Sequence, residues 1–254
     1  MLTRDEILRI QKLKSAAERK SQKRFVMEGS KIIRECIQLH PHLIECIVIS
    51  TETVLEFETG AVPCYYLPPH HFNKLSNLQS PPGYLAVCNF FNAVNSSDVL
   101  PSYLLYLDGV RDPGNFGTLL RLADWFGHTE LLASENSCDV YNPKVIQASM
   151  GAFLRVKVRY EPLSKVISEY PQHTCIGADL NGKNVFSIPL PKTGIIVLGN
   201  ESQGISLEHQ PFIQQRIHIP SLKTNGSESL NVAMAGSVIL TELHRNELRK
   251  INLS

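Results

Sequence analysis

Short apolar runs alternate with helix-patterned segments throughout residues 103–248, and this alternation limits what the chain can fold into. The apolar runs cover residues 103–107, 130–133, 155–160, 174–178, 194–198 and 216–219. The segments with apolar residues at helical spacing cover residues 115–126, 143–150, 162–170 and 229–248. Strands that are apolar on both faces and alternate with helices are typical of a parallel sheet covered on both sides. The pattern predicts an α/β domain over residues 103–254.

A second, less regular alternation occupies the first 91 residues. A helix is predicted over residues 3–20, with Thr3 and Glu6 as a capping box. A second helix opens at residues 28–30, and strands are predicted over residues 25–27, 43–50, 62–67 and 84–90. A Pro-, His- and Asn-rich stretch separates the last two strands. We therefore expect a small α/β domain over residues 1–91, a linker over residues 92–102, and the larger domain after it.

Charge is unevenly distributed along the chain. The 254 residues carry a formal net charge of only +1, and 43% of them are hydrophobic, as in an ordinary globular protein. The first 35 residues hold ten basic and five acidic side chains, so this segment carries about +5 and the remainder about −4. Such an asymmetry indicates a polyanion contact near the N-terminus, and a solvated helix face is an equally good explanation of the charge alone.

The cysteine spacing and the hydropathy argue against a zinc protein, a disulfide-stabilised protein and a membrane protein. The six cysteines are scattered and include no C-x-x-C pair, so neither a zinc site nor a disulfide framework is indicated. No apolar run approaches the roughly 18 residues that a membrane span needs, and no signal-peptide core is visible. We therefore expect a cytoplasmic protein with no membrane segment and no metal.

Three polar loops follow predicted strands, at the edge where open α/β sheets bind their ligands. In the first, Pro113 and Gly114 form a turn, Asn115 is the expected N-cap of a helix, and Arg121 lies six residues further on. A helix N-terminus is a natural anion site, although an ordinary capped helix with an exposed Arg121 is the better explanation of this loop when it is taken alone.

The second and third loops are also unremarkable when each is taken alone. The second runs Leu198-Gly199-Asn200-Glu201-Ser202-Gln203-Gly204, where the glycines permit a tight turn or a close approach to a ligand. The third starts at Ile219-Pro220 and reaches Ser229-Leu230-Asn231-Val232, where Ser229 or Ser227 is the expected cap of the last helix.

In this order and spacing the three loops resemble the signature motifs of the SpoU (TrmH-like) family, a branch of the knotted SPOUT methyltransferases. The motifs are N-x-G-x-x-x-R, then L-G-N-E-x-x-G, then I-P followed by S-L-N-V. The resemblance covers residues 103–248, and residues 24–29 (Arg-Phe-Val-Met-Glu-Gly) are similar to the family's substrate-binding domain.

The resemblance implies a fold and a reaction. The fold is a parallel-sheet methyltransferase domain with a C-terminal trefoil knot, preceded by the small α/β domain as an RNA-binding domain. The reaction is methyl transfer from S-adenosylmethionine to a ribose 2′-hydroxyl of RNA, with rRNA favoured and tRNA the alternative. A homodimer is also implied, and the two apolar faces of the last helix, with Val232, Met234 and Val238 among their residues, favour it independently.

The same resemblance assigns the site residues. Arg121 is expected to hold a neighbouring phosphate and to stabilise the developing oxyanion, because a guanidinium is almost always protonated. The other expected catalytic residues are Asn115, Glu201, Ser229 and Asn231. The expected cofactor-binding residues are Leu198, Gly199, Ile219, Leu230 and Asn231.

Two departures from the family pattern affect the third loop. Ser221 replaces the usual Met after Ile-Pro, and the loop from Pro220 to Ser229 is about two residues longer than in the bacterial rRNA enzymes. Two functions from other classes are the alternatives. A catalytically inactive relative that binds RNA during ribosome assembly would not need Asn115, Arg121, Glu201 and Asn231, and a kinase-like enzyme would need a phosphate loop that the chain lacks.

Overall fold

The computed structural model describes residues 2–91, 102–222 and 229–251. By their contacts the residues form two compact units. The first comprises Met1–Val94 with Asp139–Leu154, and the second Asn95–Cys138 with Arg155–Ser254. Residues 92–101, nearly the whole of the predicted linker, lie outside the described residues.

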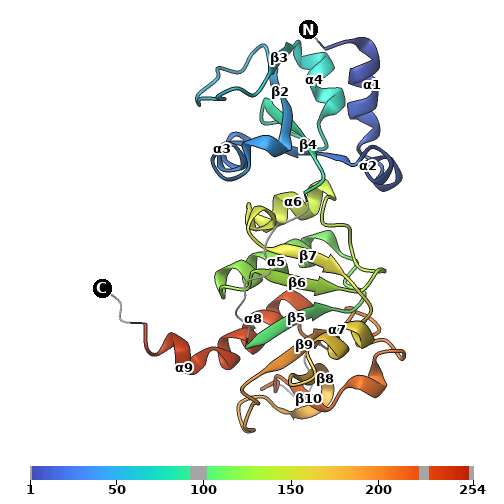
Figure 1. The fold of residues 1–254 in the computed structure, drawn as a ribbon, viewed down its shortest axis with the longest axis vertical. Helices are drawn as coiled ribbons and strands as arrows, with labels where there is room; N and C mark the ends of the chain where they lie inside the picture. The colour runs from blue at the N-terminus through green and yellow to red at the C-terminus, as the bar shows by residue number, and fades with distance from the viewer. Residues whose placement is uncertain (1, 92–101, 223–228, 252–254) are drawn as a thin grey trace. The chain divides into compact units, whose positions relative to one another are not determined.

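The second unit is built on a six-stranded sheet, as its alternating pattern predicts. The strands are β5 (Tyr103–Leu107), β6 (Glu130–Ala133), β7 (Lys157–Tyr160), β8 (Thr174–Asn184), β9 (Gly194–Leu198) and β10 (Gln215–His218). Their order is β10-β8-β9-β5-β6-β7, and every neighbouring pair is parallel (Figure 1). The central strands β5 and β9 are buried along their whole length. The predicted parallel α/β sheet is confirmed.

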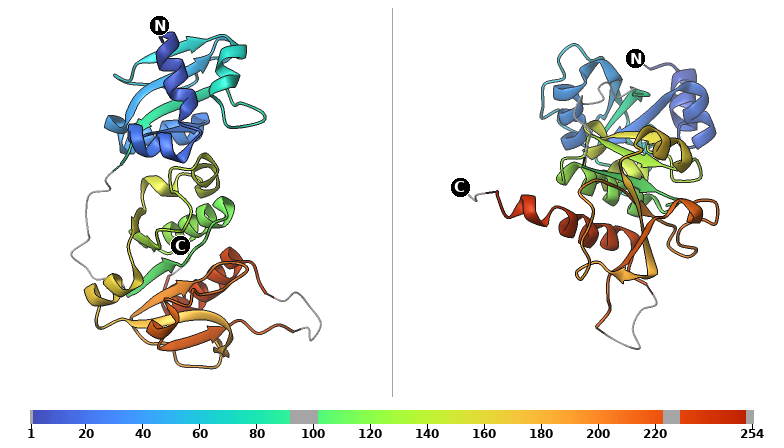
Figure 2. Two further views of the ribbon diagram at one scale, coloured as in Figure 1. Left: turned by 90° about the vertical axis from the view of Figure 1, so that its right-hand side faces the viewer. Right: turned by 60° about the horizontal axis from the view of Figure 1, so that its bottom comes forward.

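Helices cover both faces of this sheet. They are α5 (Pro113–Trp125), α7 (Leu163–Glu169), α8 (Val232–Leu243) and α9 (Arg245–Leu248), with a short 3-10 turn η3 (Gln210–Phe212). On one face, α7 packs through Leu163 and Val166 against Tyr106 of β5 and Val197 of β9. On the other face α8 packs beside α5, and Figure 2 shows α7 and α8 on opposite sides of the sheet. Gly236 permits this close approach, because a Cβ there would lie 2.6 Å from the side chain of Leu119.

Two helix starts in the second unit differ from the sequence prediction. The N-cap of α5 is Asp112, not Asn115, and its side chain accepts the backbone N–H of Asn115 at 2.8 Å. Pro113 then occupies the first helical position, where its missing N–H costs nothing. The last helix is capped by Asn231, not Ser229. It is interrupted at His244, so the predicted single helix is α8 followed by α9. The other expected cap, Ser227, lies outside the described residues.

The first unit contains a four-stranded mixed sheet. Its strands are β1 (Arg24–Glu28), β2 (Ile44–Ser50), β3 (Cys64–Leu67) and β4 (Tyr84–Asn89), in the order β1-β4-β2-β3. Only β2 and β3 are parallel to each other. The helices are α1 (Arg4–Lys12), α2 (Ala16–Gln22), α3 (Ser30–Leu39) and α4 (Pro69–Leu75), with a 3-10 turn η1 (Pro41–Leu43). Helix α4 falls in the Pro-, His- and Asn-rich stretch, where no helix was predicted.

The prediction of a single helix over residues 3–20 is wrong in one respect, because the helix is interrupted between α1 and α2. Thr3 caps α1 as expected, by accepting the N–H of Glu6 at 3.2 Å. Leu13, at the end of α1, is fully buried, and Ser15 is extended. The guanidinium of Arg19 donates to the carbonyls of Leu13 and Lys14 at 3.0 and 3.1 Å. These bonds replace the helical N–H groups that the break removes.

Residues 139–154 follow β6 in the chain yet pack with the first unit. They form α6 (Pro143–Ser149) and the 3-10 turn η2 (Ala152–Leu154), and α6 packs against β1. The ring of Tyr141 stacks on Phe90 with centroids 4.1 Å apart. Asp139 accepts two hydrogen bonds from Arg19, at 2.7 and 3.1 Å. The first unit is therefore assembled from two segments of chain. The second of these, residues 139–154, falls within the predicted second domain, residues 103–254.

We predict that Arg19→Met destabilises the protein by about 3 kcal/mol, because breaking a buried pair leaves Asp139 and two carbonyls without their donor. The Arg19 side chain is only 3% exposed and that of Asp139 20%. Urea unfolding measures the change. Lys20→Met, at the neighbouring exposed position on α2, is the matched control and should shift stability by no more than about 0.5 kcal/mol. Equal stability of the two variants would contradict the structural role of Arg19.

Candidate active site

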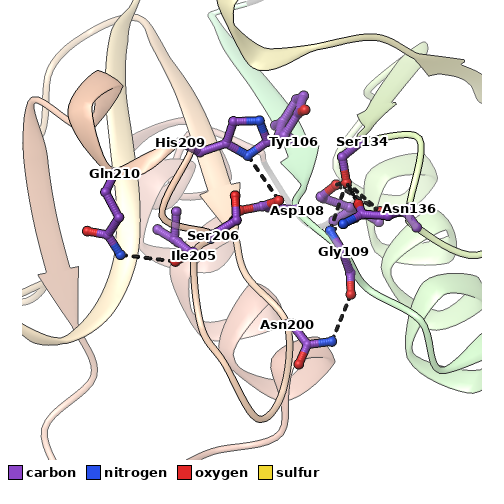
Figure 3. Close-up of polar contacts among 12 residues, drawn as sticks. Tyr106, Asp108, Gly109, Ser134, Asn136, Asn200, Ile205, Ser206, His209 and Gln210 are labelled. Carbon is purple, nitrogen blue, oxygen red and sulfur yellow. Dashed lines mark hydrogen bonds and ion pairs between the residues drawn. The ribbon is translucent and has the colours of Figure 1, made fainter.

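The first two signature loops leave neighbouring strands at the same edge of the sheet. Strands β5 and β9 pair in parallel over five residues each, so Leu107 and Leu198 lie side by side at their carboxyl ends. Beyond them, Asp108 N–H donates to the carbonyl of Leu198 at 2.8 Å. The amide of Asn200 donates to the carbonyl of Gly109 at 2.8 Å (Figure 3). The parallel register therefore brings the two loops together.

The loop after β9 is closed by its own backbone. Asn200 and Gly204 exchange backbone hydrogen bonds, each 2.9 Å long. A Cβ at position 199 would lie 2.2 Å from the carbonyl carbon of Gly204, so only glycine fits there. Gly204 itself has a φ of +67°, which side chains strongly disfavour. The two glycines that the sequence singled out are thus required by the turn.

Three of the predicted site residues form one hydrogen-bonded chain. Asn115, in the first turn of α5, donates its amide N–H to Glu201 Oε1 at 2.7 Å. The amide of Asn231 donates to Asn115 Oδ1 at 2.9 Å. Asn231 also accepts the N–H groups of Ala233 and Met234, which fixes its orientation at the start of α8. Side chains from all three signature loops therefore meet, as their resemblance to one family's motifs implies.

Besides these exposed contacts, the site contains a buried contact between an aspartate and a histidine that the sequence did not indicate. Asp108 and His209 are 2% and 5% exposed, and His209 Nδ1 lies 2.9 Å from Asp108 Oδ1 (Figure 3). The N–H of Ser206 donates to Asp108 Oδ2 at 2.7 Å. Burial alone would raise the pKa of Asp108, but the hydrogen bonds from His209 and Ser206 outweigh it, and the pKa lies below its ordinary value. Asp108 is therefore ionised at neutral pH.

The loop after β6, which is not one of the three signature loops, fixes the backbone of Gly109. The N–H of Gly109 donates to Ser134 Oγ at 2.8 Å and to Ser137 Oγ at 3.1 Å. Ser134 donates in turn to Asn136 (Figure 3). Sequence reasoning missed these residues, since a polar loop after a buried strand is common. A usable signal was the aspartate directly after the apolar run 103–107, because a carboxylate at the end of a buried strand needs partners.

The remaining predicted residues are not joined to this network by contacts among the described residues. Arg121 lies on α5, is exposed, and has no hydrogen bond or ion pair within the part of the chain that the structure describes. Leu198 is buried at the end of β9, and Ile219 is half-buried after β10. Ser229 and Leu230 are exposed beside Asn231. Of the long third loop, residues 223–228 lie outside the description.

The arrangement fits the cofactor that the motifs imply. The network offers carboxamide groups and one carboxylate, Glu201, which suit a small polar and partly cationic ligand. Leu230 and Met234, on either side of Asn231, are 49% and 59% exposed, so apolar surface adjoins the polar groups. Such a mixture of apolar surface and a few fixed polar groups is typical of a small-molecule site.

The comparisons with known proteins agree with the motifs and the geometry. Residues 102–241 match the model of the SpoU rRNA Methylase family, and residues 4–86 match that of the MRM3-like substrate binding domain. The chain belongs to the SpoU rRNA methylase family, whose methyl donor is S-adenosylmethionine. The predicted family, its enzyme class and its cofactor are confirmed.

Several relatives span most or all of the chain. The 23S rRNA (guanosine(2553)-2′-O)-methyltransferase RlmP of Bacillus subtilis is 26% identical over 91% of this chain and 93% of its own length. The 23S rRNA (guanosine-2′-O-)-methyltransferase RlmB of Neisseria meningitidis is 30% identical, over 63% of this chain and 66% of its own. A TrmH-family structure from Porphyromonas gingivalis is 32% identical, covers 97% of this chain and 99% of its own, and has a TM-score of 0.80.

A further likeness concerns the fold alone. The SpoU methyltransferase AviRb from Streptomyces viridochromogenes, solved in complex with AdoMet, is 22% identical with a TM-score of 0.83, and covers 97% of this chain and 99% of its own.

Within residues 2–91, 102–222 and 229–251, no helix is long and apolar enough to cross a membrane. The same residues include no group of three or more His, Cys, Asp or Glu that could hold a metal ion.

We predict that Asn115→Asp lowers methyl transfer by at least about tenfold, because the new carboxylate faces Glu201 at hydrogen-bond distance and cannot donate to it. Stability should change by no more than about 1 kcal/mol, since the contacts are largely exposed. A methyl-transfer assay and urea unfolding test both parts. Asn142→Asp, at the N-cap of α6, is the matched control, because Asp caps a helix as well as Asn. Full activity of Asn115→Asp would show that the network is dispensable.

Proposed function

We propose that this chain transfers the methyl group of S-adenosylmethionine to a ribose 2′-hydroxyl of 23S ribosomal RNA. The observation that carries the proposal is the hydrogen-bonded chain Glu201–Asn115–Asn231, which joins the three motifs of the SpoU family at one edge of the sheet. The relatives RlmP and RlmB, both named as 23S rRNA 2′-O-methyltransferases, support the substrate class. The alternative of a catalytically inactive relative has no support in the comparisons.

The proposed mechanism needs alignment rather than a strong base, and the proton of the 2′-hydroxyl is released to water as the methyl group is transferred. When bound, S-adenosylmethionine supplies an activated methyl group on a sulfonium, which leaves as a neutral thioether. Leu198, Gly199, Ile219, Leu230 and Asn231 are the residues proposed to hold it. Asn115 and Glu201 orient the ribose, and Ser229 lines the site beside Asn231. Arg121 is proposed to bind the neighbouring phosphate and to stabilise negative charge that develops on the 2′-oxygen.

We also propose that the chain after β10 is threaded through a loop to form a trefoil knot. In support, Asn231, at the far end of the segment that follows β10, donates to Asn115, which in turn donates to Glu201. The likeness to SpoU methyltransferase structures over nearly the whole chain supports the same threading. An experimental structure that traces residues 218–232 continuously tests it, and a trace that passes beside the loop instead would refute it.

Mapping of 2′-O-methylation in all stable RNAs, with and without the gene, tests the substrate. Loss of one mark in 23S rRNA is the expected result. Loss of a tRNA mark alone would assign the enzyme to tRNA, and an unchanged pattern would refute the proposed function. Because the substrate is ribosomal RNA, we propose that the protein works in the cytoplasm.

The first unit is proposed to bind the RNA, since residues 4–86 match a substrate-binding domain. The structure reduces the number of basic side chains that are candidates for contacts with RNA. Arg19 is buried against Asp139, and Arg24 is paired with both Glu6 and Glu45. Arg9 and Lys12 are exposed instead, and they border a hollow of about 420 Å³. These two side chains are the best candidates for phosphate contacts near the N-terminus.

A homodimer is proposed for the active form. The last helix supports it, because Met234 is 59% exposed on α8 although the opposite side of this helix is buried against α5 and the sheet. A second subunit would cover such an apolar face. Sedimentation at micromolar concentration should give about twice 28.4 kDa, and a mass near 28.4 kDa would contradict the proposal.

We predict that Arg121→Ala still folds and binds S-adenosylmethionine but loses most of its methyl transfer, by about 100-fold or more. The reason is that the exposed guanidinium has no structural partner among the described residues, so removing it should affect only the reaction. Calorimetric titration with the cofactor and single-turnover methylation separate the two effects. Near-normal turnover would remove Arg121 from the mechanism.

We predict that the double variant Arg9→Ala, Lys12→Ala weakens RNA binding. The plot of log affinity against log salt should become less steep, by up to about 2 in the magnitude of its slope, because binding with fewer phosphate contacts releases fewer counterions. Fluorescence anisotropy across a salt series measures both quantities. Lys165→Ala, on α7 of the second unit, is the control for a loss of charge elsewhere. An unchanged salt slope in the double variant would place the RNA contact on other residues.

A further inference from the structure

The loop that carries Gly199, Asn200 and Glu201 is held at both of its ends by one residue. Before the loop, the carbonyl of Leu198 accepts the backbone N–H of Asp108 at 2.8 Å. After the loop, the N–H of Ser206 donates to the carboxylate of Asp108 at 2.7 Å. Asp108 therefore bridges the two ends of residues 199–205 from the neighbouring strand, and sets how far apart they lie.

From these ends the constraint extends to the exposed tip of the loop. The mutual backbone bonds of Asn200 and Gly204 close the turn, and Asn200 Nδ2 binds the carbonyl of Gly109, the residue after Asp108. Asn200 Oδ1 accepts the N–H groups of Ser202 and Gln203 at 3.0 and 3.3 Å. Glu201 lies inside this set of bonds, so its backbone cannot shift without breaking one of them.

His209 holds the other oxygen of the same carboxylate. Its Nδ1 lies 2.9 Å from Asp108 Oδ1, while the N–H of Ser206 donates to Oδ2. The His209 ring meets Tyr106 edge to face, with centroids 5.5 Å apart and an interplanar angle of 86°. This packing fixes the ring, and the ring fixes the carboxylate (Figure 3). Both residues are almost completely buried, so neither can touch a ribose or a methyl donor.

We propose that Asp108, oriented by His209, is a positioning residue for methyl transfer, which holds the 199–205 loop in the shape that binds S-adenosylmethionine and presents Glu201 to Asn115. This inference rests on the proposed function. Asp108 and His209 lie outside the three signature motifs. In this proposal they set the geometry of the second motif, the loop that follows β9.

The principal test compares Asp108→Ala with Asp108→Asn in the full-length chain. Alanine removes both acceptors, so the affinity for S-adenosylmethionine should fall about tenfold or more and its KM should rise in parallel. Asparagine can still accept from Ser206 and can donate to His209 if the ring adopts its other tautomer, so most of the affinity should be retained. The affinity for RNA should change much less than the affinity for S-adenosylmethionine in both variants, since the basic residues proposed to contact RNA near the N-terminus lie in the first unit.

The matched control is Asp124→Ala, which removes an aspartate of the second unit that is paired with Arg155 on the surface. It should leave the cofactor affinity within twofold of wild type. Hydrogen exchange provides a readout that does not depend on catalysis. Amides of residues 199–206 should exchange faster in Asp108→Ala than in wild type, while those of β5 and β9 should not.

If Asp108→Ala does not fold, His209→Phe carries the same test. Phenylalanine keeps a ring against Tyr106 and removes the ring nitrogen that lies 2.9 Å from Asp108 Oδ1, so a loss of about fivefold in cofactor affinity is expected. Wild-type cofactor affinity in the folded variant, together with unchanged exchange in residues 199–206, would overturn the inference. Absence of cofactor binding by the wild-type protein would overturn the proposed function instead, and the exchange measurement would still decide whether Asp108 holds the loop.

Discussion

The parallel pairing of β5 with β9 is the constraint on which the site depends. Five consecutive residues of each strand pair, from Tyr103 with Gly194 to Leu107 with Leu198, and all ten are buried. Because parallel strands end at the same edge, the loops after them meet although they are about 90 residues apart in the chain. Burial on both faces makes this register hard to change, since a shift by one residue would move every side chain from the packing on its own face to that on the other.

Much of the fold follows from apolar periodicity, which is a local property of the sequence. The six strands of the second unit and their parallel arrangement were predicted because their apolar runs alternate with helices. Helix ends were predicted less well, because several residues near each end can cap it and tertiary contacts select one. Asp112 excludes Asn115 from the cap of α5, which leaves the Asn115 amide free to bind Glu201 and Asn231.

Contacts between distant segments explain most of what the sequence did not reveal. Residues 139–154 pack with the first unit because Asp139 meets Arg19, 120 residues away, and Tyr141 stacks on Phe90. Neither pairing has a local signature. The candidate site divides in the same way. Asn115, Glu201 and Asn231 were predicted from motifs, whereas Asp108 and His209 become a pair only when β5 and β9 are adjacent.

The exposed network and the buried pair have different physical roles. Hydrogen bonds among Asn115, Glu201 and Asn231 compete with water, so alone they contribute little to a fixed geometry. A buried carboxylate is costly unless polar groups surround it, and here the N–H of Ser206 donates to one oxygen and the ring of His209 lies 2.9 Å from the other. Any displacement of the loop after β9 would leave that charge with too few partners. Distorting the loop therefore costs more free energy through the loss of partners for buried Asp108 than through the loss of the exposed hydrogen bonds. This difference keeps the surface site rigid.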